Sequence, residues 1–347
     1  MTKEKQLFVS TLIKWSRTID RPMPWKGIKN PYFIWLSEII LQQTRVEQGM
    51  NYYLKFTKAY PKVEDLANAP IEEVLKHWEG LGYYSRARNL HHTAQLIVEK
   101  FNGVFPTNHA DILSLKGIGP YTAAAIASFA YDLPYAVVDG NVIRVLSRYF
   151  GIETAFDIPE GRKKFDALAI EILPENQSAI YNQAIMDFGA TVCKPAAADC
   201  STCVMQKKCC AFEQDKVDVW PIKANKTKIE TKYFNYFVLQ YKNKCYVKKR
   251  EKDFWKDLYE FYLIDDKNKW SLAKVNALIK KEKWSVAGSI SYNDLSQKLS
   301  HRDIQARFFI IELNKKPSLH DFIEVDKSNM SKFAFPKIIN SYIENYF

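Results

Sequence analysis

The sequence predicts a mainly helical region of about 220 residues, followed by a smaller domain that mixes helices and strands. Up to residue 220 or so, apolar residues recur every three or four positions, and Pro and Gly stand at the ends of these segments. Farther on, the runs 233–239 and 307–311 are rich in aromatic and β-branched residues, which predicts strands. A helical pattern at 272–279 lies between them.

A polar, charged segment separates the two parts. Residues 223–232 (KANKTKIETK) contain few apolar side chains and predict a linker. We therefore expect a helical region at 1–222 and the smaller α+β domain at 233–347. A chain of 347 residues is long enough for two or three domains.

The composition favours a polyanionic partner. Fifty Lys and Arg residues against thirty-nine Asp and Glu residues give a net charge of +11, which is typical of proteins that bind nucleic acid. A solvated basic surface is the alternative explanation. Neither the apolar core of a signal peptide nor a stretch long enough to cross a bilayer is present. We expect a soluble, cytoplasmic monomer with no membrane partner.

Residues 111–144 predict two helices joined by a tight hairpin, Lys116-Gly117-Ile118-Gly119. Gly suits the left-handed exit from a helix, and Pro120 suits the first position of the next one. Glycines let backbone N–H groups approach an anion closely, and the positive end of the second helix adds to the attraction. We therefore expect Gly117 and Gly119 to bind a phosphate group.

A carboxylate follows in the same segment. Asp139 directly precedes an apolar run with helical spacing, where Asp is a favoured N-cap. The helix N-terminus should keep this carboxylate ionised. Capping alone would explain the residue, and capping is also compatible with catalysis.

A second acidic residue, Glu38, lies inside an apolar helix. Asn30 and Pro31 predict the start of that helix, and the run that follows is apolar nearly all round. No cation lies three or four positions from Glu38, so desolvation should raise its pKa towards a value useful for a general acid. A Glu that points at solvent or at a distant Arg is the alternative. Two carboxyl groups with separated pKa values are typical of one acid and one charge stabiliser.

A cysteine cluster predicts a metal centre. Cys193, Cys200, Cys203 and Cys209 have the spacing C-x6-C-x2-C-x5-C. Four thiolates this close in sequence can hold an iron–sulfur cluster or a tetrahedral zinc ion, and the spacing alone does not decide between them. Cys210 duplicates the last position, so either neighbour could be the fourth ligand.

Together these motifs resemble the helix-hairpin-helix DNA glycosylases with an iron–sulfur cluster, most closely the MutY family of adenine DNA glycosylases. The matching segments are the four-cysteine spacing and residues 35–44, 80–90, 115–123 and 138–141. The resemblance is strong over residues 8–220. It implies a six-helix barrel at about 26–137 and an iron–sulfur subdomain formed by about 1–25 and 138–222. Residues 250–261 and 299–301 resemble, more loosely, the family's lesion-reading domain, which is related in fold to the nucleotide hydrolase MutT.

By this resemblance the enzyme removes adenine mispaired with 8-oxoguanine, or with guanine, in duplex DNA and binds one 4Fe-4S cluster. Glu38 would protonate the adenine at N7, and Asp139 would stabilise the cationic sugar. Asn141 would orient Asp139, and Tyr121 would lie close to the sugar. Related endonuclease III enzymes have a Schiff-base Lys where this chain has Tyr121, so a monofunctional hydrolytic glycosylase is implied.

The resemblance also implies contacts with DNA. Gln42 and Tyr83 match positions that enter the base stack near the lesion; the alternatives are an exposed helix end for Gln42 and core packing for Tyr83. Ser300 and His301 match positions beside the oxidised guanine. Trp25 would line the adenine pocket, with core packing as the alternative, and Arg86 would contact the backbone or be solvated. Two residues depart from the family pattern: Leu299 replaces an aromatic residue, and Asp257 stands where Gly is more usual.

Two other functions fit parts of the sequence. One is an endonuclease III-like pyrimidine-lesion glycosylase/lyase, which Tyr121 and the extra C-terminal domain argue against. The other is a non-catalytic, metal-containing DNA-binding protein, which the composition and the hairpin alone would permit.

Overall fold

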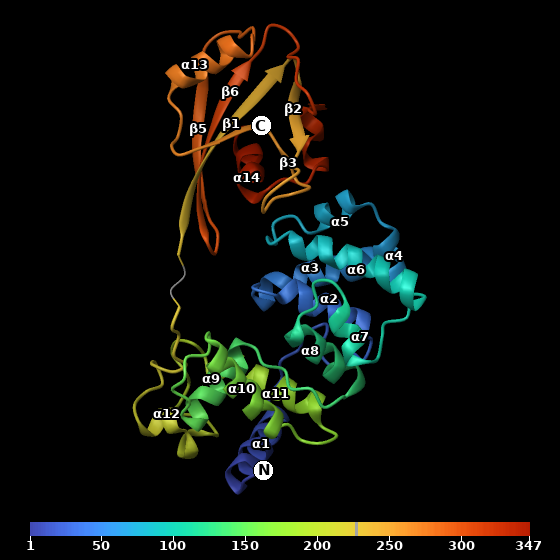
Figure 1. The fold of residues 1–347 in the computed structure, drawn as a ribbon, viewed down its shortest axis with the longest axis vertical. Coiled ribbons are helices and arrows are strands. Elements are labelled where there is room, and N and C mark those ends of the chain that lie inside the picture. Colours follow the sequence, from blue (N-terminus) through green and yellow to red (C-terminus); the bar gives the residue numbers. More distant parts are fainter. Residues whose placement is uncertain (226–227) are drawn as a thin grey trace. The chain divides into compact units, whose positions relative to one another are not determined.

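The computed structural model describes residues 1–225 and 228–347, and contacts between residues divide the chain into two compact units. The first unit comprises Met1–Asn68 and Asn89–Lys226, and the second comprises Ala69–Arg88 and Thr227–Phe347 (Figure 1). The expected linker at 223–232 includes residues 226 and 227, which lie outside the described residues. Strand β1 begins at Glu230, inside the segment that the polar composition had marked as linker.

The described part of the first unit is helical. Helix α6 (Ser85–Phe101) begins in the second unit and continues into the first. The remaining α-helices of the first unit are α1 (Lys3–Ser16), α2 (Pro31–Leu41), α3 (Val46–Ala59), α4 (Val63–Asn68), α7 (His109–Ser114), α8 (Pro120–Tyr131), α9 (Gly140–Phe150), α10 (Pro159–Glu171), α11 (Ser178–Thr191) and α12 (Cys210–Glu213).

The predicted helix starts are confirmed. Pro31 opens α2, and the Asn30 side chain caps it by accepting a hydrogen bond from the Tyr32 N–H. Pro120 opens α8, which follows the short helix α7 across the predicted hairpin. Asp139 is the N-cap of α9. Each of these features depends on residues close together in sequence, so the local pattern was sufficient to predict it.

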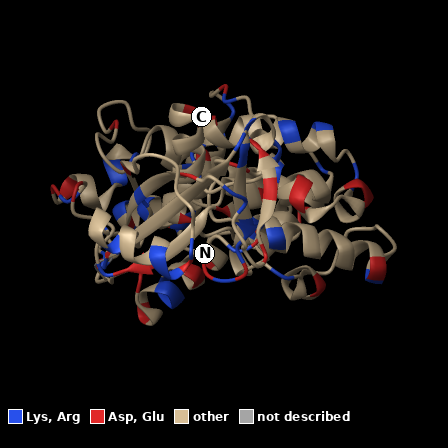
Figure 2. Ribbon diagram, turned by 90° about the horizontal axis from the view of Figure 1, so that it is seen from above, with Lys and Arg blue, Asp and Glu red and all other residues tan. Residues whose placement is uncertain are grey.

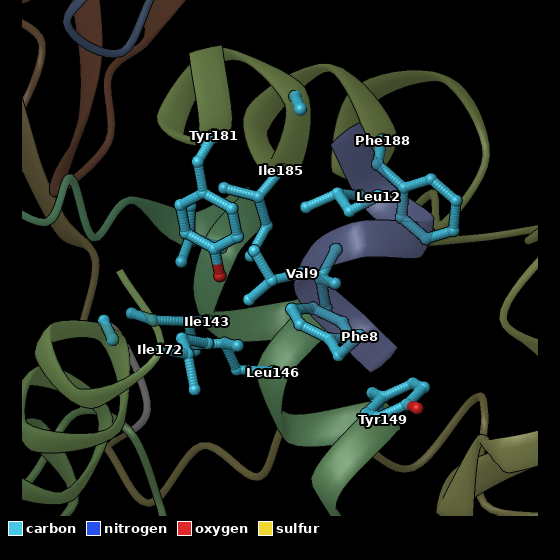
Figure 3. Packing of buried hydrophobic residues seen from close by; sticks show 14 of the residues in the cluster. Phe8, Val9, Leu12, Ile143, Leu146, Tyr149, Ile172, Tyr181, Ile185 and Phe188 are labelled. Atoms are coloured by element: carbon cyan, nitrogen blue, oxygen red, sulfur yellow. The ribbon is translucent and has the colours of Figure 1, made fainter. Parts of the chain in front are cut away.

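Helices α1, α9 and α11 share one hydrophobic core. Figure 3 shows Phe8 and Leu12 of α1 near Leu146 of α9 and near Ile185 and Phe188 of α11. All five side chains are at most 2% exposed, and burying a side chain of this size contributes about 1.5–3 kcal/mol. This packing fixes α9, and with it the Asp139 cap, against α11.

The second unit contains a mixed sheet, which has seven strands among the described residues. The main order is β3-β2-β1-β6-β5, with β4 paired to β1 and β7 paired to β2. The long strands β1 and β6 run parallel, with Tyr236 opposite Phe308, and the other pairs are antiparallel. The strands are β1 (Glu230–Tyr241), β2 (Lys244–Lys249), β3 (Tyr259–Glu260), β4 (Tyr262–Asp266), β5 (Ser291–Lys298), β6 (Arg302–Glu312) and β7 (Ile323–Asp326).

Helices accompany this sheet, as expected for an α+β domain. They are α5 (Ile71–His77), α13 (Leu272–Lys281) and α14 (Lys337–Tyr346). The predicted strands at 233–239 and 307–311 lie inside β1 and β6, and the predicted helix at 272–279 lies inside α13. Both strands extend beyond the apolar runs from which they were predicted. The additional residues at the strand ends are mostly polar and partly exposed, so the apolar pattern did not include them.

The second unit also takes in residues 69–88, from the middle of the helical region. The Phe335 N–H donates to Glu79 at 2.9 Å, and the Lys76 ammonium donates to the Phe333 carbonyl at 3.0 Å. Arg88 donates to the Lys256 carbonyl at 2.7 Å. These contacts join positions about 170 to 260 residues apart, and the local sequence pattern did not predict them.

Charged residues of both signs are distributed along the whole ribbon (Figure 2). Both signs therefore occur in the helical and in the α+β parts of the chain. Among the described residues, none of the helices combines the length and the apolar character needed to span a bilayer.

Candidate active site

Glu38 lies on α2 with only 8% of its surface exposed, as its apolar neighbours predicted. Burial raises the pKa of its carboxyl to about 7. A hydrogen bond from the Tyr121 side chain opposes this shift, and the charge of Asp139 adds to it. Glu38 is therefore largely protonated just below neutral pH, which suits a general acid.

Asp139 is held by the first turn of α9. Its Oδ1 accepts the Val142 N–H at 2.8 Å, and its Oδ2 accepts the Asn141 side-chain amide at 2.7 Å. Burial raises the pKa of Asp139, while these hydrogen bonds and the charge of Arg144 lower it. The helix N-terminus thus favours the carboxylate as expected, but burial outweighs it, and the net direction is upward.

One cavity of about 810 Å³ brings the two carboxyl groups together. Glu38, Asp139, Tyr121 and Asn141 all line it, although they come from α2, α8 and α9. Burial and the two acidic neighbours raise the pKa of Tyr121 well above its usual value, so its hydroxyl stays protonated and donates to Glu38. The volume of the cavity is large enough for a nucleoside, and both carboxyl groups are among the side chains that line it.

The orientation of Asn141 follows from its partners. Its Oδ1 accepts a hydrogen bond from Arg144 at 2.8 Å, and a guanidinium can only donate. The amide nitrogen must therefore be the atom that faces Asp139. Arg144 is held in turn by the carbonyls of Gly189 and Cys193, both at 2.7 Å. No local sequence signal pointed to Arg144, because its partners lie up to 49 residues away.

A buried aspartate and two partly exposed cations form another part of the cavity wall. Asp187 of α11 is 1% exposed and accepts hydrogen bonds from Arg21 and, at 3.0 Å, from Lys26. All three residues line the cavity, as does Trp25, which is 9% exposed and packs edge-on against Tyr53. Trp25, which was predicted either to line a pocket or to pack in the core, thus lines the cavity and also packs against a core residue. No local sequence signal pointed to Asp187, since its cations lie more than 160 residues away.

The two hairpin glycines occupy different environments. Gly117 has φ of +82°, and a Cβ there would lie 2.7 Å from the Cβ of Asn89. Gly119 has an ordinary φ, serves as the N-cap of α8, and would present a Cβ to open space. Gly117 is thus required by the fold, whereas Gly119 leaves the N-terminus of α8 open to a ligand.

Four cysteines surround a small hollow of about 30 Å³. Cys193, Cys200, Cys203 and Cys209 line it, whereas Cys210 does not and lies near Gly151. Within residues 1–225 and 228–347, no three His, Cys, Asp or Glu side chains are arranged to hold a single metal ion. Donors do reach the sulfurs: the Arg148 guanidinium lies 3.4 Å from the Cys193 sulfur, and the Met205 N–H lies 3.4 Å from the Cys203 sulfur.

Tyr83 and Ser300 lie in the second unit and form a hydrogen bond through their hydroxyl groups. Ser300 and His301 are exposed in the turn between β5 and β6. Gln42, in contrast, lines the cavity of the first unit and donates to Thr122 at 3.3 Å. The residues expected to contact DNA therefore belong to both units.

The environment of Arg86 does not match the contact with the DNA backbone, or the solvation, that the sequence led us to expect. It is only 9% exposed, and its guanidinium lies over the Trp78 ring. Because its charged group is buried against aromatic rings, Arg86 is not presented to solvent as a phosphate contact would be.

The two residues that depart from the family pattern lie outside the helices and strands. Asp257 has φ of +67°, a conformation that favours Gly, and its carboxylate lies 3.6 Å from Arg88. Leu299 is partly buried and begins the turn after β5, where its N–H donates to the Arg302 carbonyl at 2.7 Å.

Residues 36–173 match the family described as HhH-GPD superfamily base excision DNA repair protein. The chain is also 37% identical over 316 residues to the adenine DNA glycosylase of Buchnera aphidicola subsp. Baizongia pistaciae (strain Bp). That alignment covers 89% of this chain and 87% of the relative. The chain belongs to the adenine DNA glycosylase family.

Solved structures show how far the glycosylase fold extends in this adenine DNA glycosylase family member. A thermostable thymine-DNA glycosylase is 33% identical with a TM-score of 0.57, covering 61% of this chain and 98% of that one. Endonuclease III in a complex with DNA is 21% identical with a TM-score of 0.54, covering 62% and 99%, which shows the shared fold. Both leave more than a third of the chain unmatched, whereas the alignment with the Buchnera enzyme leaves about a tenth.

Proposed function

We propose that this chain is a monofunctional DNA glycosylase that removes adenine paired with 8-oxoguanine in duplex DNA and leaves an abasic site. Its family gives the reaction class, which is removal of adenine from DNA by hydrolysis of the N-glycosyl bond. The pairing with 8-oxoguanine, the action as a monomer and the residue roles below are our proposal. The single observation that carries it is the cavity shared by Glu38 and Asp139.

Glu38 acts as the general acid. It donates its proton to N7 of an adenine that has left the base stack, while the bond between C1′ and N9 breaks. The electron pair of that bond stays with the base, so the protonated adenine leaves neutral. The raised pKa of Glu38 supports this role, since a carboxyl group with a pKa of about 7 retains its proton near neutral pH.

Asp139 stabilises the sugar cation that remains. Its hydrogen bonds to Val142 and Asn141 hold the carboxylate in place before the charge develops, which is when fixed electrostatics are most effective. Water then adds to C1′ and loses a proton, which gives the abasic site. By the family resemblance, Tyr121 stands at the motif position where a lyase has its Schiff-base Lys. A phenol cannot form a Schiff base, so we expect the strand to be left uncut.

The second unit reads the base opposite the adenine. Removal of a base from duplex DNA leaves a gap in the base stack that must be filled. Tyr83 would enter the stack when the adenine leaves it, and so would Gln42 of the first unit. Ser300 and His301, at the exposed turn between β5 and β6, would contact the oxidised guanine. We assign the α+β domain as the MutT-like lesion-reading domain on this basis.

Cys193, Cys200, Cys203 and Cys209 would hold a 4Fe-4S cluster. The donor set fits, because four thiols line one hollow with apolar walls and two of their sulfurs have N–H donors nearby. When bound, the cluster would cross-link residues 193–209. The exposed Lys207 and Lys208 of that segment are then available to contact phosphate.

Cys209→Ala is expected to lose the brown iron–sulfur chromophore, and Cys210→Ala to retain it. Cys209 lines the hollow with the other three cysteines, whereas Cys210 lies outside it. Visible absorbance and iron content of the two purified variants are the measurements. A colourless Cys210→Ala protein beside a brown Cys209→Ala protein would exchange the fourth ligand.

Gly117→Ala is expected to destabilise the fold, and Gly119→Ala to weaken duplex binding with the fold intact. Alanine at position 117 would have to keep a φ that is unfavourable for a residue with a Cβ, and its Cβ would collide with Asn89. Together these effects should lower the free energy of unfolding by more than about 1 kcal/mol. A Cβ at position 119 has no protein atom within 4 Å, so it would obstruct only a bound phosphate. Thermal unfolding and duplex affinity separate the two effects. Undiminished affinity in Gly119→Ala would remove the hairpin from DNA binding.

A panel of duplexes tests the proposed activity. Each duplex carries one labelled strand and one defined pair: adenine opposite 8-oxoguanine, adenine opposite guanine, adenine opposite thymine, or an oxidised pyrimidine opposite guanine. After incubation with the protein, half of each sample is treated with hot alkali, which cuts at abasic sites.

Cleavage only after alkali, and most rapidly for adenine opposite 8-oxoguanine, is the expected result. Cleavage without alkali at the oxidised pyrimidine would indicate a glycosylase/lyase instead. Binding without any cleavage would indicate a non-catalytic DNA-binding protein.

A further inference from the structure

Tyr83 has an unusual backbone conformation for an aromatic residue. Its φ is +47°, and 42% of its surface is exposed. A side chain with a Cβ is disfavoured at positive φ, so this conformation persists only when the surroundings stabilise it. The contacts that hold the turn at residues 80–84 should therefore decide where the Tyr83 ring points.

Arg86 makes several of these contacts. Its guanidinium carbon lies 5.6 Å from the centre of the Tyr83 ring and 5.0 Å from the centre of the Trp78 ring. Its Nη2 donates to the Gly82 carbonyl at 3.3 Å, and the Trp78 indole N–H donates to the same oxygen at 2.9 Å. The Arg86 backbone N–H donates to the Tyr83 carbonyl at 2.9 Å.

Arg86 remains a cation in this buried position. Burial lowers its pKa to about 10, so the guanidinium is protonated near neutral pH. A planar cation that is largely withdrawn from water interacts strongly with the face of an aromatic ring. The charge of Arg86 thus acts on the Tyr83 ring directly.

A second contact reaches the other end of the Tyr83 side chain. Its hydroxyl forms a hydrogen bond with Ser300, in the turn between β5 and β6. The side chain is therefore fixed at the ring by Arg86 and at the hydroxyl by Ser300. Either contact alone would leave one end of an exposed side chain free to move.

We propose that Arg86 is a positioning residue that holds the Tyr83 ring ready to enter the base stack beside the lesion. This inference rests on the proposed function, because it assumes that Tyr83 enters the stack. It replaces the expected contact between Arg86 and the DNA backbone. It also predicts that Arg86 affects lesion discrimination solely through Tyr83.

Arg86→Met and Arg86→Lys test the proposal. Met keeps much of the buried volume without the charge, and Lys keeps the charge without the flat guanidinium. The measurement is the single-turnover rate of adenine removal opposite 8-oxoguanine and opposite guanine. We expect the ratio of the two rates to fall about tenfold in Arg86→Met and less in Arg86→Lys, since a desolvated cation–aromatic contact accounts for about one order of magnitude.

A double-mutant cycle with Tyr83→Ala separates positioning from a general loss of structure. Once Tyr83 is absent, Arg86→Met should change the rate ratio no further. Arg88→Met is the matched control. This neighbouring arginine donates to Lys256 rather than to Gly82, so its effect should be the same whether Tyr83 is present or has been replaced by alanine. Equal effects of Arg86→Met in both backgrounds would overturn the proposal.

The rate ratios of the unmodified protein and of the variants distinguish a failure of this inference from a failure of the proposed function. If the unmodified protein removes adenine opposite both bases equally, the proposed lesion preference fails, whatever Arg86 does. If it discriminates and Tyr83→Ala loses discrimination while folded Arg86→Met retains it, the role of Arg86 alone fails. Thermal unfolding identifies a variant that is not folded, and Arg86→Lys then serves as the test variant in the cycle.

Discussion

Asp139→Asn is expected to abolish base removal while leaving duplex binding intact. Asn is also a good N-cap, so the first turn of α9 should keep its geometry. The negative charge that faces the developing sugar cation is lost, and a single fixed electrostatic contact of this kind contributes about 10²–10³ in rate. We expect a loss at the upper end of that range or beyond, because an entire charge is removed.

Single-turnover removal of adenine and duplex affinity measure the two effects separately. Asp139→Ala is the matched control, since it removes both the charge and the cap. It should be inactive like Asp139→Asn but less stable by about 1 kcal/mol. Asp139→Asn turning over at the rate of the unmodified protein would exclude Asp139 from the mechanism and leave it as a helix cap.

Features that depend on neighbouring residues were predictable from the sequence. Asn30 and Asp139 act as helix caps, and Gly117 takes the left-handed conformation of the hairpin. The burial of Glu38 was predictable for the same reason, because the helix around it has no polar face to turn towards water. The upward shift in its pKa followed from that burial.

Features that depend on distant partners were not predictable. An arginine in an amphipathic helix is usually solvated, yet Arg144 binds the carbonyls of Gly189 and Cys193 from other parts of the chain. Asp187 was missed for the same reason. Nothing in the local sequence of 69–88 indicates that it packs with a sheet beginning at Glu230.

Two residues of the same type can have different roles because they contact different partners. Arg86 and Arg88 are two positions apart, and the sequence offers no reason to treat them differently. In the structure Arg86 lies against two aromatic rings, whereas Arg88 reaches the Lys256 carbonyl. The motif therefore identifies residues that contribute to the site, but it does not predict which groups each of them contacts.

Glu38→Gln is expected to lose adenine removal by several orders of magnitude with little change in stability. Gln has nearly the same shape and can still accept the hydrogen bond from Tyr121, but it has no acidic proton to donate. General acid catalysis contributes about 10²–10⁴ in rate, here because an unprotonated adenine is a poor leaving group. Single-turnover rates report the loss, and thermal unfolding confirms that the variant is folded.

The pH dependence of the unmodified enzyme gives an independent test of the same role. Glu38 must be protonated to act, and its pKa in the folded protein is raised to about 7. Its protonated fraction is high below pH 7 and falls above it, so the single-turnover rate should decline about tenfold per pH unit well above 7. Glu38→Gln should lose this alkaline decline along with the activity, since the titrating group is gone. An unmodified enzyme with a flat profile from pH 6 to 9, or a Glu38→Gln variant that retains both the rate and the decline, would assign the proton to another group.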